Sequence, residues 1–125
     1  MALYGIVSDI HGNLEALSAA LELLAERGVE RILCLGDIVG YNADPDACVR
    51  ALAELPMDAV AGNHDVIAVG KLGVQRCTDR AAFALARTRR AIAPATRAAL
   101  NTLPRRLVVE DDIVLTHGGV ADLCE

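Results

Sequence analysis

The chain has 125 residues, a hydrophobic content of 54% and a charged content of 23%. This length suits one domain with its own core, and the composition excludes a disordered chain. The net charge of -5 argues against general nucleic-acid binding, which depends mainly on cationic contacts with phosphates. No apolar run approaches the roughly 20 residues needed to cross a bilayer, and Asp9 interrupts the N-terminal apolar stretch before it could serve as a secretory signal. We therefore expect a cytoplasmic protein without membrane contact.

The first half of the chain alternates between strand and helix patterns. The continuous apolar run 32–35 is typical of a parallel strand that is covered on both faces. Asn13 and Asp44 are favourable N-cap residues, and Pro45 suits the first position of a helix. The expected elements are a strand at 3–8, a helix from Asn13 to Gly28, a strand at 31–35, a helix from Asp44 to about Leu55 and a strand at 58–61. This βαβαβ pattern predicts an α/β fold with a parallel sheet.

The second half predicts two helices and a hairpin. A loop containing Gly70 and Gly73 precedes them. The expected elements are helices at 78–92 and 94–103, and strands at 105–110 and 113–116 that turn at Asp111 and Asp112.

Basic residues are concentrated between Lys71 and Arg106, where nine of them accompany a single acidic residue. One interpretation is a solvated helical face that pairs with acidic neighbours, which is the usual role of such a run. The other is a basic cap over an anionic substrate. In that case we expect Arg87 and Arg90 to contribute to substrate binding.

The four cysteines show no Cys-x-x-Cys spacing. Cys34 lies within an apolar run, where a thiol behaves as a small hydrophobic group. We predict that Cys34, Cys48, Cys77 and Cys124 are reduced structural residues, and neither a zinc knuckle nor a disulfide framework is supported.

All three histidines lie in short polar clusters that follow predicted strands. The carboxyl ends of parallel strands meet at one edge of a sheet, where ligands bind in open α/β folds. Carboxylate, amide and imidazole groups together suit ions such as manganese, iron or zinc, and they do not form an all-oxygen calcium cage. The clusters are Asp9-Ile10-His11, Gly36-Asp37, Gly62-Asn63-His64-Asp65 and Thr116-His117-Gly118-Gly119. We therefore predict a dinuclear site in which one carboxylate bridges two ions that hold a hydroxide between them.

In these four clusters the sequence resembles the calcineurin-like metallophosphoesterase superfamily. The clusters match four of its five motif blocks in order, and the continuation Gly40-Tyr41 is similar to the bacterial phosphodiesterase branch. The resemblance implies an αββα two-sheet sandwich, two divalent ions (manganese, iron, zinc or nickel) and hydrolysis of a phosphorylated small molecule or nucleotide.

The resemblance also implies a role for each polar residue. Asp9 and His11 would bind the first ion, Asp37 would bridge both, and Asn63 and His117 would bind the second. Asn63 would also touch the substrate phosphate, while His64 would act as general acid, oriented by Asp65. The alternative role of His64 is structural: its side chain would hold the Asn63 loop by a hydrogen bond.

The fifth motif block of the superfamily, Gly-His-x-His, has no counterpart in the 125 residues. We therefore expect residues 1–125 to form a single partial phosphoesterase domain that binds metal weakly and is an impaired catalyst. The alternative is a non-catalytic module of the same fold that binds a metal or a partner. In that case a homo-oligomer could cover the sheet face that the shortened fold leaves open.

Overall fold

A computed structural model describes residues 2–119 of the chain, and within them it contains two small β-sheets. Parallel strands β1 (Tyr4–Val7), β2 (Arg31–Cys34) and β3 (Met57–Ala59) form the first sheet, in the order β1-β2-β3. Strands β4 (Arg106–Val109) and β5 (Ile113–Thr116) form an antiparallel hairpin. The predicted α/β fold with a parallel sheet and a second sheet is confirmed.

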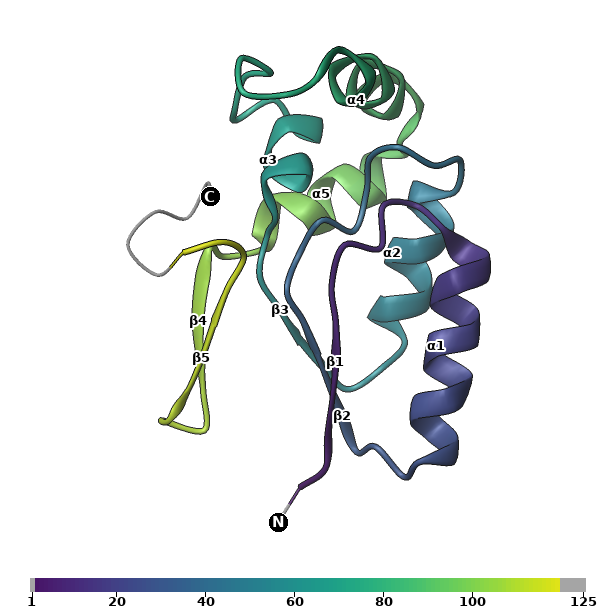
Figure 1. The fold of residues 1–125 in the computed structure, drawn as a ribbon, viewed down its shortest axis with the longest axis vertical. Coiled ribbons are helices and arrows are strands. Elements are labelled where there is room, and N and C mark those ends of the chain that lie inside the picture. Colours follow the sequence, from purple (N-terminus) through teal and green to yellow (C-terminus); the bar gives the residue numbers. More distant parts are fainter. Residues whose placement is uncertain (1, 120–125) are drawn as a thin grey trace.

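The parallel sheet lies between two helices and the hairpin. Helices α1 (Leu14–Glu26) and α2 (Pro45–Ala53) cover one face, and the β4-β5 hairpin lies on the opposite side (Figure 1). The helix side carries the larger hydrophobic core, which includes Leu17, Cys34 and Leu52. A smaller core of Leu33, Val60, Val109 and Leu115 joins the sheet to the hairpin. Both faces of the sheet are thus partly buried, as the apolar run in β2 predicts.

Three further helices lie beyond the carboxyl ends of the parallel strands (Figure 1). They are α3 (Asn63–Ala68), α4 (Asp79–Ala91) and α5 (Pro94–Thr102). The sequence predicted α4 and α5 but not α3. With six residues α3 is too short to show a helical period, and its first residues belong to a polar cluster that was interpreted only as a site motif.

Local details differ from prediction at three places. The Asn13 side chain accepts the Ala16 N–H as expected, but the Asp44 side chain makes no capping hydrogen bond, although Asp44 is the N-cap residue of α2 as predicted. Strand β3 ends at Ala59, and Ala61 N–H bonds the carbonyl of Pro104 instead of the sheet. The hairpin turn contains the predicted Asp111 and Asp112 and begins one residue earlier, at Glu110; φ is positive at Glu110 and Asp111.

The structure also describes three of the four cysteines and the length and polarity of the helices. Cys34 and Cys48 are buried and free, and Cys77 is half-buried and free, as predicted, while Cys124 lies outside the described residues. None of the helices between residues 2 and 119 is both long and apolar enough to cross a membrane.

Candidate metal centre

The loops that follow β1 and β2 run side by side. Their backbones continue the parallel pairing of the two strands for several residues, so the first two polar clusters are neighbours. The bonds are Asp9 N to Gly36 O (3.0 Å), His11 N to Asp37 O (2.9 Å) and Gly12 N to Ile38 O (2.8 Å). The parallel sheet therefore brings Asp9, His11 and Asp37 to one edge, as predicted from the topology.

Two buried carboxylates attach the loop after β3 to the loop after β2. Asp37 Oδ1 accepts the backbone N–H of His64 at 2.9 Å. Asp65 is fully buried and accepts three backbone N–H groups, from Ile38 (2.9 Å), Val39 (3.1 Å) and Gly62 (2.9 Å). Burial raises the pKa of Asp65 to about 6, and these bonds oppose the rise, so the carboxylate is ionised at neutral pH.

The contacts of Asp65 correct its expected role. Both of its oxygens are directed to backbone N–H groups, and no hydrogen bond joins it to His64. His64 Nδ1 is buried and has no hydrogen-bond partner among residues 2–119. Adjacent residues in a helix point in different directions, which the sequence motif does not convey. Asp65 therefore acts on the site by fixing two loops, and it does not orient the imidazole.

Asp37 lies between two histidines. Its Oδ2 is 3.6 Å from His11 Nε2 and 3.5 Å from His117 Nε2, and His11 Nε2 is also 3.6 Å from Asp9 Oδ1. The Asp37 side chain is almost completely buried, whereas Asp9 is exposed. One oxygen of Asp37 is thus close to the Nε2 atoms of both histidines.

The tautomers of both histidines follow from their other contacts. His11 Nδ1 lies 3.1 Å from the carbonyl of Val39, and His117 Nδ1 lies 2.6 Å from the carbonyl of Leu35. A carbonyl only accepts hydrogen bonds, so each Nδ1 carries a proton, and in the neutral ring Nε2 is the nitrogen with the lone pair. Metal-binding histidines are commonly fixed in this way.

Three residues of the cluster have left-handed backbone conformations. The φ angles are 55° at Asp9, 49° at His11 and 53° at Asp37. Each costs on the order of 1 to 3 kcal/mol for a residue with a side chain, and such strain gathers at functional sites. The strain supports a functional cluster over a chance grouping of polar residues.

His64 lies in a different environment from the other two histidines. Its ring is 4.8 Å from the His11 ring and 5.1 Å from the Tyr41 ring, measured between centroids. Burial is the main cause that lowers the pKa of His64, with Asp37 opposing it and the other two histidines adding to it. Gly40 makes room for this stack, since a Cβ there would lie 3.3 Å from His64 Cγ. Tyr41 is a site residue that the sequence did not single out, although Gly40-Tyr41 continues the second motif.

The structure groups the predicted ligands as follows. Asp9, Asp37 and His117 offer donor atoms that lie within 4.8 Å of one another. So do His11, Asp37 and His64, although His64 is predicted to be a general acid and not a ligand. Asn63, the remaining predicted ligand, precedes His64 at the start of α3 and lines an adjacent pocket.

The predicted substrate-binding arginines lie elsewhere. Arg87 and Arg90 are exposed on α4, and Arg90 lines a separate groove between α3 and α4. The basic residue that shares a pocket with Asn63 is Arg76, in the segment between these helices. Arg97 donates to the carbonyls of Ala68 and Arg89, so part of the basic run has a structural role.

An α/β scaffold gathers carboxylates and imidazoles at the carboxyl ends of its parallel strands, and these side chains are candidate metal ligands. The family model for the calcineurin-like phosphoesterase superfamily domain matches residues 2–123. The chain therefore belongs to the calcineurin-like phosphoesterase superfamily.

Individual relatives agree with this assignment. The protein MJ0912 of Methanocaldococcus jannaschii is 39% identical over 112 residues, which cover 90% of this chain and 45% of that protein. The phosphodiesterase YfcE of Escherichia coli is 40% identical over 65 residues, which cover 50% of this chain and 34% of YfcE. A metallophosphoesterase structure from Sphaerobacter thermophilus superposes with a TM-score of 0.68 at 37% identity, covering 87% of this chain and 44% of that one. The chain thus spans less than half the length of these relatives.

Proposed function

We propose that the protein is a metal-dependent phosphoester hydrolase with a dinuclear centre, acting on a phosphorylated small molecule or nucleotide. The position of Asp37 Oδ2 between His11 Nε2 and His117 Nε2 carries this proposal. Membership of the phosphoesterase superfamily and similarity to a named phosphodiesterase support the reaction class.

The donor spacing fits divalent ions. Two donor atoms about 2.1 Å from one ion, separated by a tetrahedral angle, lie about 3.4 Å apart. The observed separations of Asp37 Oδ2 from the two imidazole nitrogens are 3.6 and 3.5 Å. Asp9 and His11 would hold one ion, Asn63 and His117 the other, and Asp37 both. When bound, such ions activate water and stabilise negative charge on a phosphoryl group.

The chain's own residues would complete the reaction. Asn63 carries an amide that suits a phosphate oxygen, and His64 stands beside the ligands with one ring nitrogen not used for hydrogen bonding within residues 2–119. We assign His64 to protonation of the leaving oxygen. An anionic phosphoester bound beside it would raise its pKa and so oppose the effect of burial.

Metal binding tests the proposal directly. Asp37→Asn keeps the oxygen that accepts the His64 N–H but removes the shared charge. We expect manganese affinity, measured by calorimetry on the full chain, to fall at least about tenfold. The matched control is Asp112→Asn, an exposed carboxylate in the hairpin turn, which should bind as the unaltered chain does. Equal affinity in all three proteins would overturn the assignment of Asp37.

The role of His64 is tested by the leaving group. A general acid contributes on the order of 100-fold or more when the leaving oxygen is a poor leaving group, and little when it is p-nitrophenolate. His64→Gln should therefore slow hydrolysis of an alkyl phosphodiester much more than that of bis(p-nitrophenyl) phosphate. Equal losses with both substrates would indicate the structural alternative.

We also propose that the 125-residue chain is a weak metal binder and a slow catalyst. Each ion takes at least about four ligands, whereas five predicted side chains with one of them shared supply three to each ion. Metal stoichiometry and turnover of an aryl phosphodiester measure this. Two tightly bound ions and fast turnover would contradict it.

A further inference from the structure

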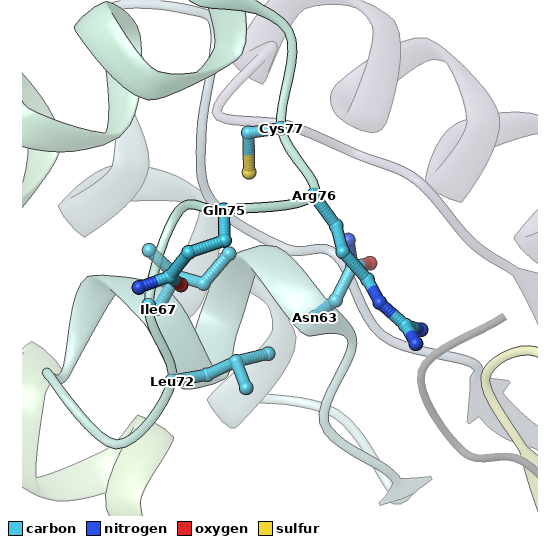
Figure 2. Close-up of a pocket in the computed structure, with 7 residues that line it drawn as sticks. Asn63, Ile67, Leu72, Gln75, Arg76 and Cys77 are labelled. Atoms are coloured by element: carbon cyan, nitrogen blue, oxygen red, sulfur yellow. The ribbon is translucent and has the colours of Figure 1, made fainter.

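A surface pocket of about 290 Å³ opens beside the predicted metal centre. It lies between α3 and the segment that connects α3 to α4, and Figure 2 shows the side chains around it. The volume is close to the lower limit of about 300 Å³ for small-molecule sites. The lining residues are Asn63, Ile67, Leu72, Gly73, Gln75, Arg76 and Cys77.

The lining is mixed: Ile67, Leu72 and the Gln75 amide lie on one side, and Asn63 and Arg76 lie on the other (Figure 2). The Ile67 side chain is buried and Leu72 is 36% exposed. The half-buried thiol of Cys77 adds a weakly polar group to these two apolar side chains. Figure 2 shows Arg76 extending along the side where Asn63 lies, away from Ile67 and Leu72. No acidic side chain lines the pocket. Its chemistry therefore suits a ligand with an apolar body and an anionic end.

The pocket is continuous with the proposed reaction centre through Asn63. This residue is both a predicted metal ligand and part of the lining, and the next residue, His64, bonds Asp37 through its backbone. A phosphate held at Asn63 would place its ester group against Ile67 and Leu72. The groove between α3 and α4 that contains Arg90 does not include Asn63 and lacks this connection.

We propose that this pocket binds the planar base of a nucleoside phosphate and that it sets the substrate preference of the site. Leu72 and Ile67 contact the ring, the Gln75 amide offers a donor and an acceptor to its polar edge, and Arg76 lies beside the phosphate. The inference rests on the proposed phosphoesterase function, because that function places a phosphate at Asn63.

The test compares binding of adenosine 5′-monophosphate and ribose 5-phosphate to the full chain by NMR titration, with manganese replaced by a diamagnetic divalent ion. We expect the nucleotide to bind at least about tenfold more tightly. Leu72→Asn should remove that preference and leave ribose 5-phosphate binding unchanged, whereas Arg76→Gln should weaken both ligands. Leu23→Asn, at a 51% exposed leucine on α1, is the matched control and should change neither.

The outcomes separate the two proposals. Equal affinities for both ligands, or an effect of Leu72→Asn no larger than that of Leu23→Asn, would overturn the pocket assignment even if phosphoesters are hydrolysed. A nucleotide preference that Leu72→Asn abolishes, in a chain without hydrolytic activity, would uphold the pocket and count against the proposed function.

Discussion

The close approach of two loops at Gly36 provides the strongest test of how the centre is built. Gly36 has φ 92°, and a Cβ there would lie 2.8 Å from both the carbonyl carbon of Ala61 and the Cα of Gly62, and closer still to the Gly62 nitrogen. All of these are backbone atoms, so no side-chain rotation relieves the overlap. Gly36→Ala would therefore push apart the loop that carries Asp37 and the loop that carries Asn63.

The expected loss of stability has two parts. The left-handed conformation costs an alanine about 1 to 2 kcal/mol. Forcing backbone apart in a packed region adds about 1 to 3 kcal/mol. The total of about 2 to 5 kcal/mol is smaller than the stability of most domains, which is about 5 to 15 kcal/mol, so we expect the variant to fold.

Gly28→Ala is the matched control. Gly28 also has a left-handed backbone, with φ 75°, but a Cβ there meets nothing within 4 Å. It should therefore show only the conformational cost of about 1 to 2 kcal/mol. Comparing the two variants by urea unfolding, followed by circular dichroism, isolates the effect of the loop contact.

Metal affinity is the second readout. The bond from His64 N to Asp37 Oδ1 crosses between the two loops, so their separation should weaken manganese binding at least about tenfold in Gly36→Ala and not in Gly28→Ala. If both variants unfold within about 0.5 kcal/mol of each other and bind manganese equally, the loop contact does not organise the centre.

Three further predictions concern the scaffold. Thr78→Ala removes a side-chain acceptor for an N–H in the first turn of α4 and should cost about 1 kcal/mol in urea unfolding, whereas Asp44→Ala, which removes no such bond, should cost less. Arg97→Ala removes hydrogen bonds to carbonyls of α3 and α4 and should lower the free energy of unfolding by about 1 to 3 kcal/mol. Arg87→Ala, at an exposed position, should change it little, and similar values for the two variants would contradict the bridging role of Arg97. Burial raises the pKa of the Cys34 thiol from 9.0 to about 11, so the unfolded chain ionises first and the unfolding free energy should fall between pH 9 and pH 11; an equally steep fall in Cys34→Ala would refute this.

The scaffold was predictable because its signals are local. Strand β2 is a run of buried residues, and α1 begins at an asparagine that caps it in the structure. Helix α3 was not predictable in this way. It has only six residues. The buried Asp65 carboxylate accepts the N–H of Gly62 at the start of this helix and also the N–H of Ile38 in the loop after β2. Such a contact joins residues 27 apart and leaves no periodic trace in the sequence.

The meeting of the polar clusters was predictable from topology, but the individual contacts were not. Parallel pairing places Asp9 and Asp37 at one edge whatever their side chains do. The role expected for Asp65 failed because the motif gives adjacency along the chain and not direction in space. The charge pattern likewise predicted a basic region, yet only the path of the segment after α3 shows that Arg76 shares a pocket with Asn63.

We propose that the backbone facing each ring separates the roles of the three histidines. His11 and His117 meet the carbonyls of Val39 and Leu35, which fix the Nδ1 proton and leave Nε2 for a metal. His64 Nδ1 has no hydrogen-bond partner within residues 2–119, and this is compatible with the general-acid role proposed for His64. A histidine in such a motif is compatible with either role, metal ligand or general acid. What each ring faces depends on the loop path, which is held by the Asp65 carboxylate and by the close contact at Gly36.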